Sequence, residues 1–202
     1  MIAWTVRAAL DSGVFARVIV TTDDDVIGQV ADEEGAEVLR RPPELGADHV
    51  PLTEVAAHAL AVHPGYDAFC LMMANCPLRN AEDIRTSLEA FLGSDCESAL
   101  MSVFAYNWNQ PFWALKMDRE RLSRLFPQGD AASDDVVCPS GAIRWFRTAD
   151  FRESPTWYPE RLRGFRMPWH RAIDIDTSDD YHAARCVAHA LDTGFRFAEA
   201  AH

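Results

Sequence analysis

Lysine and positive charge are scarce in this 202-residue sequence. It holds one lysine, Lys116, and 19 basic residues against 31 acidic ones, for a formal net charge of -12 at pH 7. A protein whose main partner is a nucleic-acid backbone needs a basic surface, so no nucleic-acid partner is expected. A nucleotide substrate stays open, because a single site can be locally basic or can recruit a cation.

Long apolar runs and paired cysteines are also missing. No stretch approaches the roughly 20 apolar residues that span a bilayer, and the N-terminus lacks the layout of a signal peptide, so no membrane partner is expected. The five cysteines, Cys70, Cys76, Cys96, Cys138 and Cys186, are odd in number and free of CxxC spacing. We interpret them as reduced thiols packed mostly in a core, which predicts a cytoplasmic protein.

What the chain does contain is an alternation of short apolar runs and amphipathic segments. Strands at 17–22 and 36–40 flank a helix that opens at Asp23 and ends at Gly35. This strand–helix–strand unit builds parallel sheets with helical crossovers, so the sequence predicts an α/β fold. The length suits one domain, and no linker divides it.

The remaining expected elements follow from apolar periodicity and turn residues. The most apolar run, 66–74, predicts a central strand. Asn80 is a plausible N-cap for a helix that starts near Ala81. Other elements are helices at 2–12, 53–63 and 178–192, strands at 98–106 and 164–175, an irregular region at 107–140, and a strand-then-helix segment at 140–151.

The stretch "WHRAIDIDTSDDYHAA" (169–184) carries two carboxylates one residue apart in an apolar setting. In an extended segment Asp174 and Asp176 share a face, while Ile173 and Ile175 point the other way. Two carboxylates on one face repel unless a cation lies between them, and hard oxygen ligands at a sheet edge suit Mg²⁺. An alternative is that Asp176 or Thr177 caps the last helix, which leaves Asp174 unexplained.

Three segments resemble the acylneuraminate cytidylyltransferases, which make CMP-activated sialic, pseudaminic and legionaminic acids. Residues 1–45 are similar to the first third of that family, "NCPLRNAEDI" to its TSPLR-type turn and helix, and "AIDIDTSDDYHAA" to its closing DIDT-type segment. The resemblance implies a Rossmann-like nucleotidyltransferase fold, a three-layer sandwich with a mainly parallel sheet, and a homodimer. It also implies Mg²⁺-dependent attack of the anomeric hydroxyl of an acidic nine-carbon sugar on the α-phosphate of CTP.

The resemblance assigns roles to seven residues. Asp174 and Asp176 match the metal-binding acids of the family, and Lys116 falls near a lysine that is offered to the sugar carboxylate. Four further residues would contact the nucleotide or the sugar: Arg41, Thr53, Asn75 and Arg79. From the residues alone, Thr53 is also a candidate N-cap, and Asn75 and Arg79 are candidate turn residues.

The main departure from the family lies at the start of the sequence. The family opens with a strand and a loop of the form IPARGGSKxIPxKN, which cradles the triphosphate. Met1 falls just beyond that loop, so the first strand and the phosphate loop are absent from residues 1–202. The expectation is a misassigned start, a fragment or lost catalysis, with weak or absent turnover by these residues alone.

Aromatic residues gather in the irregular region and predict a partner surface. Trp108, Phe112, Trp113 and Phe126 lie within 105–138, which we expect to form a small dimerisation lobe. Three alternatives to the main function stay open. They are a related sugar nucleotidyltransferase such as an octulosonate cytidylyltransferase, a catalytically silent binding subunit, and a glycosyltransferase with a metal-binding D-x-D motif.

Overall fold

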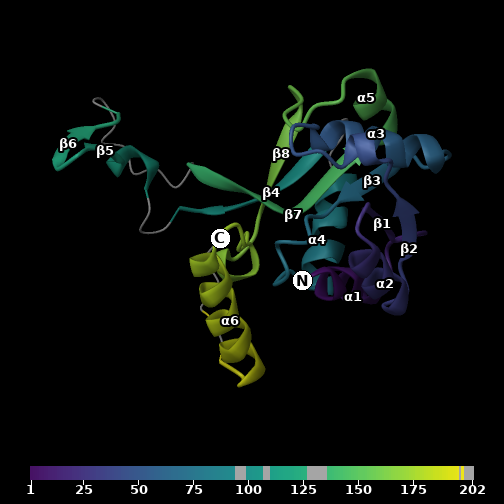
Figure 1. The fold of residues 1–202 in the computed structure, drawn as a ribbon, viewed down its shortest axis with the longest axis horizontal. Coiled ribbons are helices and arrows are strands. Elements are labelled where there is room, and N and C mark those ends of the chain that lie inside the picture. Colours follow the sequence, from purple (N-terminus) through teal and green to yellow (C-terminus); the bar gives the residue numbers. More distant parts are fainter. Residues whose placement is uncertain (94–98, 107–109, 127–135, 196, 198–202) are drawn as a thin grey trace.

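The computed structural model describes residues 1–93, 99–106, 110–126, 136–195 and 197, and arranges them as strands flanked by helices (Figure 1). The helices are α1 (Ile2–Ser12), α2 (Asp25–Glu33), α3 (Leu52–Val62), α4 (Ala81–Leu92), α5 (Thr148–Glu153) and α6 (Ser178–Asp192). The strands are β1 (Ile19–Thr22), β2 (Glu37–Arg40), β3 (Ala68–Leu71), β4 (Ala99–Ala105), β5 (Leu115–Asp118), β6 (Arg121–Arg124), β7 (Val137–Arg147) and β8 (Leu162–Arg166). Short 3-10 turns lie at Pro43–Leu45, Pro111–Trp113 and Trp169–Arg171.

The strands form three hydrogen-bonded groups. β1 and β2 pair in parallel, and β5 and β6 form an antiparallel hairpin. The larger sheet has the order β3-β7-β4-β8. In it β7 is antiparallel to β3 and β4, while β4 and β8 are parallel, so three of its four strands run in one direction. The expected α/β fold with a mainly parallel sheet is confirmed.

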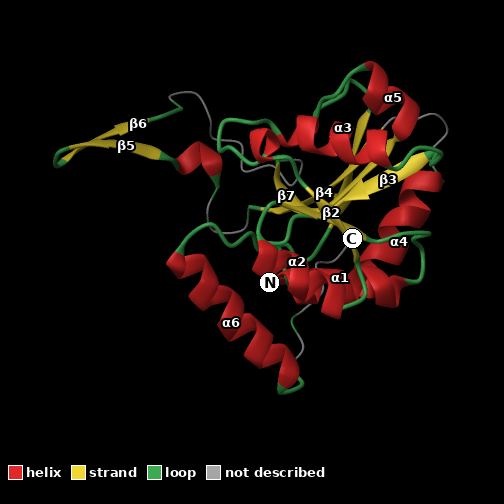
Figure 2. Ribbon diagram, turned by 45° about the vertical axis from the view of Figure 1, so that its right-hand side comes forward, coloured by secondary structure: helices red, strands yellow, loops and turns green. Residues whose placement is uncertain are grey.

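Helices cover both faces of the strands, which makes three layers. Figure 2 shows α3 and α5 on one side and α1 and α4 on the other. On the first side Leu60, Phe146 and Phe151 pack into one core cluster. On the second side Ile84 and Trp145 pack into another. Among the described residues, no helix is long and apolar enough to cross a membrane.

Polar side chains cap three of the six described helices, namely α2, α4 and α6. The Asp24 side chain accepts a hydrogen bond from Ile27 N, and Asn80 forms a capping box with Asp83 at the start of α4, as expected. The prediction that Thr53 is an N-cap is wrong. α3 begins at Leu52 after Pro51, whose fixed φ suits a helix start, and no side chain caps it.

Three other expectations need correction. The run at 66–74 yields only the four-residue strand β3, which lies at an edge of its sheet rather than at the centre. The region 107–140 contains the β5–β6 hairpin and the start of β7. The segment 164–175 leaves the sheet after Arg166, because Pro168 has no N–H to donate and a 3-10 turn follows.

Candidate active site at the turn after beta 3

Two segments that are far apart in the sequence meet beside the end of β3. One is the turn at 73–80, between β3 and α4, and the other is the segment at 172–177, which leads into α6. The amide of Ile175 donates to the carbonyl oxygen of Asn75 at 2.9 Å and fixes their register. This contact brings both predicted metal ligands against the turn.

Asp174 is held by donors from two elements. Its Oδ1 atom accepts hydrogen bonds from the Cys76 thiol at 2.5 Å, from the Ser140 hydroxyl at 3.3 Å and from Gly141 N at 3.3 Å. The only contact of Oδ2 that we find among the described residues is a long one, 3.4 Å from Gly141 N. One carboxylate oxygen is therefore fixed to the protein, and the other keeps most of its capacity to bind a cation.

Asp176 is the exposed member of the pair. Its Oδ1 atom accepts a hydrogen bond from Asn75 Nδ2 at 2.9 Å. Ile173 and Ile175 pack against a separate apolar cluster that includes Val187 of α6. The predicted alternation of aspartates and isoleucines is confirmed.

The helix-capping alternative for Asp176 is not what the structure shows. Thr177 is the N-cap of α6, and its hydroxyl accepts from the Asp180 amide. The Asp180 carboxylate completes the capping box by accepting from Thr177 N at 2.8 Å. The side chain of Asp176 takes no part in this capping box. Its carboxylate, which accepts only from Asn75 among the contacts described above, therefore remains available for another role.

The thiols around the turn are protonated donors. Burial raises the pKa of Cys76, and the neighbouring Asp174 carboxylate raises it further. Burial likewise raises the pKa of Cys70 to about 12. Cys76 can therefore donate its proton to Asp174 at neutral pH instead of competing with it as a second anion.

The donor set fits a hard divalent cation. Asp174 and Asp176 offer carboxylate oxygens, and the described residues contain no cluster of three or more His, Cys, Asp or Glu side chains that could enclose a metal by itself. Mg²⁺ is commonly held by one or two carboxylates, with substrate phosphates and water completing its shell. Two carboxylates beside an open turn match that mode of binding.

The side chain of Arg79 points into the protein interior and binds carbonyl oxygens of the turn. Its side chain is buried, with 2% exposed. One amino group donates to the Cys76 carbonyl, and the other donates to Met73 O at 2.6 Å and to Thr5 Oγ1 of α1 at 3.0 Å. Burial lowers the pKa of Arg79, which makes these three acceptors important for holding its charge. These contacts make Arg79 a residue that positions the turn.

Among the described residues, neither Arg41 nor Lys116 forms a hydrogen bond or ion pair with the two aspartates. Arg41 follows β2, donates to Thr21 O at 2.8 Å and lies 4.0 Å from Asp23 Oδ1. Lys116 is exposed on β5, in a hairpin that projects away from the body of the molecule (Figure 1). Thr53 lies in the first turn of α3. The structure thus joins Asn75, Asp174 and Asp176, with Arg79 beneath them, and leaves the other three predicted residues apart.

Sequence reasoning missed the residues that hold Asp174. Cys76, Ser140 and Gly141 come from the turn and from β7, so no local spacing joins them to Asp174. Gly141 is also needed for close packing, because a Cβ atom there would lie 2.8 Å from Met73 Cγ. The available signal was the Ser-Gly pair inside the strand, since glycine in a strand often marks close approach.

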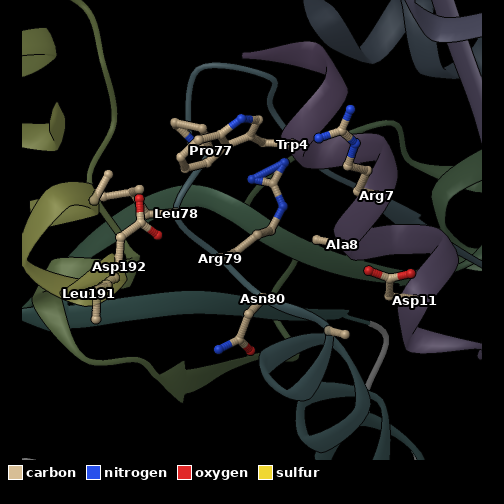
Figure 3. A pocket seen from close by; sticks show the side chains of 12 residues that line it. Trp4, Arg7, Ala8, Asp11, Pro77, Leu78, Arg79, Asn80, Leu191 and Asp192 are labelled. Carbon is tan, nitrogen blue, oxygen red and sulfur yellow. The ribbon is translucent and has the colours of Figure 1, made fainter. Parts of the chain in front are cut away.

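A cavity of about 290 Å³ lies between α1, the turn and α6. Figure 3 shows Trp4, Arg7 and Asp11 on the α1 side, Pro77, Leu78, Arg79 and Asn80 on the turn, and Leu191 and Asp192 from α6. Neither Asp174 nor Asp176 lines it. The cavity is therefore a feature separate from the carboxylate pair.

Comparison with known sequences identifies the family of this chain. A family model described as "Cytidylyltransferase" matches residues 1–103. The N-acylneuraminate cytidylyltransferase of Escherichia coli O18:K1:H7 is 34% identical over 187 residues, covering 91% of this chain and 45% of that protein. The pseudaminic acid cytidylyltransferase of Campylobacter jejuni is 25% identical over 199 residues, covering 92% of this chain and 83% of that protein.

Solved structures agree at the level of the fold. A CMP:2-keto-3-deoxy-manno-octonic acid synthetase complexed with CTP superposes with a TM-score of 0.63 at 16% identity, over 95% of this chain and 88% of that chain. A 4-diphosphocytidyl-2C-methyl-D-erythritol synthase from Anaerococcus prevotii gives 0.61 at 12% identity, over 93% and 85%. The chain spans less than half the length of the first N-acylneuraminate relatives that it matches. With half of its residues matched by the family model, the chain belongs to the cytidylyltransferase family, and it is similar in sequence to N-acylneuraminate cytidylyltransferases.

Proposed function

We propose that this chain carries out CTP-dependent cytidylyl transfer to the anomeric hydroxyl of a sialic-type nine-carbon sugar acid. The observation that carries the proposal is the convergence of Asp174 and Asp176 on the turn after β3, in a member of the cytidylyltransferase family. In this reaction the anomeric oxygen forms a bond to the α-phosphorus of CTP. The bond from that phosphorus to the oxygen that bridges to the β-phosphate breaks, and pyrophosphate leaves.

Asp174 and Asp176 would hold a divalent cation, with Mg²⁺ as the expected ion. Such a cation, when bound, offsets negative charge on the phosphate oxygens. Asn75 orients Asp176, and Arg79 fixes the backbone of the turn, so that both carboxylates are positioned before substrate arrives. Arg41 is the proposed nucleotide contact at the end of β2, and Thr53 lies at the start of the next helix.

We also propose that residues 1–202 act as one domain of a homodimer, with 105–138 as the dimerisation lobe. Leu115, Met117 and Leu122 of the hairpin are each more than half exposed. A two-stranded hairpin is marginally stable alone in water, so these side chains need a surface to cover them. Lys116 would then serve the active site of the second copy, because β5, which carries it, projects away from the body of the molecule (Figure 1). A cytoplasmic location stays a prediction.

The test is the thermal stability of residues 1–202 with and without CTP, in Mg²⁺ and in EDTA. A ligand that binds only the folded state stabilises it by about 2.7 kcal/mol at a hundredfold excess over Kd. The shift should require Mg²⁺, vanish in Asp174→Asn, and persist in Asp179→Asn, which changes an exposed carboxylate of α6. A shift that survives in EDTA or in Asp174→Asn would contradict the proposed site.

The acceptor sugar is tested separately by release of pyrophosphate. Nine-carbon sialic-type acids should support more release than an eight-carbon octulosonate, and turnover by residues 1–202 alone is expected to be weak. A clear preference for the octulosonate would instead favour the related sugar nucleotidyltransferase. Because the chain covers 45% of its N-acylneuraminate relative, the same panel should be run on the longest available form of the protein.

A further inference from the structure

The pairing of β4 with β7 is interrupted at one point. The regular pairs on either side of the interruption are Met101 with Arg144 and Val103 with Pro139. One residue of β4, Ser102, therefore lies opposite four residues of β7, 140–143, which we call the β7 arch. The hydrogen bonds of a regular antiparallel ladder are lost here, so the backbone groups of the β7 arch need other partners.

The hydroxyl of Ser102 bonds to both ends of the β7 arch. It accepts a hydrogen bond from Ile143 N at 3.0 Å and donates one to Ser140 O at 3.2 Å. Ser102 is fully buried. Removing its hydroxyl therefore deprives a buried backbone donor and a buried backbone acceptor of the partner that replaces the ladder.

A second buried serine links the β7 arch to the segment that carries the aspartates. The Ser140 hydroxyl accepts from Ala142 N at 3.1 Å, inside the arch. Its single proton is shared between Ala172 O, at 3.1 Å, and Asp174 Oδ1, at 3.3 Å. Ser140 thus fixes the arch and the segment at 172–177 to each other.

Gly141, in the β7 arch, bonds to both segments of the candidate site. Its amide donates to Asp174 Oδ1 at 3.3 Å, and its carbonyl accepts from Met73 N at 3.0 Å, where the turn after β3 begins. The place of this amide depends on the shape of the arch, which Ser102 holds at both ends. A continuous chain of contacts therefore runs from Ser102 to the Asp174 carboxylate.

We propose that Ser102 is a positioning residue for the Asp174 carboxylate, because its hydroxyl fixes the β7 arch and the arch orients Asp174. The inference rests on the proposed function, in which Asp174 and Asp176 hold a divalent cation. Ser102 acts through the backbone, since both of its hydroxyl bonds are to β7. Outer groups that orient the ligands of a metal typically contribute about 10- to 100-fold to metal affinity.

Ser87 of α4 offers a matched control. It is as fully buried as Ser102, and its hydroxyl also makes two bonds, accepting from Trp145 Nε1 at 2.9 Å and donating to Ile84 O at 2.8 Å. Neither partner belongs to the β7 arch or to the segment at 172–177. Ser87→Ala therefore removes a buried hydroxyl with the same number of bonds and leaves the arch intact.

Binding of Mn²⁺ to residues 1–202 tests this role, measured from the electron paramagnetic resonance signal of the free ion. Mn²⁺ is the probe because it takes the same oxygen ligands as Mg²⁺. The binding that counts is the part that Asp174→Asn removes. Ser102→Ala should raise the dissociation constant of that part about tenfold or more, and Ser87→Ala should leave it within about twofold.

A second measurement follows the β7 arch itself, through the nuclear magnetic resonance signal of the Gly141 amide. In the unmodified chain and in Ser87→Ala this signal should shift when Mg²⁺ is added, because its acceptor, Asp174, binds the ion. In Ser102→Ala it should already be displaced without Mg²⁺ and should respond less. If Ser102→Ala does not fold, Ser140→Ala, which removes the bond to Ala142 N, tests the same arch by both measurements.

Other results would overturn the inference. Unchanged Mn²⁺ affinity in folded Ser102→Ala, with the Gly141 signal in its original place, would show that the β7 arch does not need this hydroxyl. Equal weakening by Ser102→Ala and Ser87→Ala would assign the effect to a general loss of stability. If Asp174→Asn leaves Mn²⁺ binding unchanged, the proposed function loses its metal site and the inference fails with it. If Asp174→Asn abolishes binding and Ser102→Ala does not weaken it, the inference alone fails.

Discussion

Predicted site residues lie both in the turn after β3 and on the β5–β6 hairpin, and the two regions differ in how many contacts the chain makes to these residues. At the turn, Asp174 and Arg79 are each joined to three protein groups, and Arg79 is almost fully buried. On the hairpin, all eight strand residues are exposed, and Lys116 lies among them. The first site is therefore built by the chain itself, whereas the second needs another surface to become a site.

This contrast explains how each residue responds to substitution. Hydrogen bonds to a buried charged group contribute roughly 1.5–3 kcal/mol each, and an unsatisfied buried partner costs a similar amount. Exposed side chains on a hairpin usually change stability by less than about 0.5 kcal/mol.

Arg79→Met is expected to have the largest effect. It removes the donors to Met73 O and Thr5 Oγ1 and leaves both the turn and α1 without a buried partner. We expect the free energy of unfolding to fall by about 3 kcal/mol or more. Urea denaturation measures this, with Arg121→Met in β6 as the matched control, which should stay within about 0.5 kcal/mol. Equal losses in both variants would remove the proposed difference between the regions.

Asp174→Ala and Asp176→Ala separate the two carboxylates of the site. The first removes the acceptor of Gly141 N and the shortest acceptor of the Cys76 thiol, while Ser140 keeps its bond to Ala172 O, and should lower the free energy of unfolding by about 1–3 kcal/mol. The second removes an exposed group and should change it by less than about 0.5 kcal/mol. Both should abolish the Mg²⁺-dependent shift with CTP. A loss of stability in Asp176→Ala as large as that in Asp174→Ala would show that both carboxylates are structural.

Local signals in the sequence were sufficient for much of the fold. Asn80 marks the start of α4 through its own side chain, so this boundary was predicted, and the alternation at 172–177 placed Asp174 and Asp176 together. The failures involve contacts between distant segments. The edge position of β3 depends on which strands pair, and the contact of Cys76 with Asp174 joins residues 98 positions apart. The hairpin β5–β6 was missed because its apolar residues face solvent, where no core enforces a period.

His170, in the segment before α6, should make a smaller contribution to stability, and this contribution depends on pH. Burial lowers the pKa of His170, and the positive charge of Arg171 adds to this, so the folded state favours neutral imidazole. The stabilisation is complete above the unfolded pKa of about 6.5 and is lost as pH falls through the lower folded value. His170→Phe keeps a ring against Phe197 and should flatten the difference in stability between pH 7.5 and about pH 5.5. An unchanged pH profile would show that His170 does not titrate with folding.

The hairpin should show the smallest effect on the stability of one chain and a clear effect on association. Leu115 and Met117 are 53% and 70% exposed, so replacing both with serine removes little packing within the chain. We expect a change in unfolding free energy within about 0.5 kcal/mol, because few contacts are lost. If the hairpin docks on a second copy, the same two side chains become buried there, and their loss should convert dimer to monomer in sedimentation at micromolar concentration.

The matched control, Asp118→Ser and Arg121→Ser, changes the polar end of the hairpin and should leave the dimer intact. A monomer in the unmodified chain, or a dimer that survives the serine pair, would mean that the apolar side chains of the hairpin serve another surface.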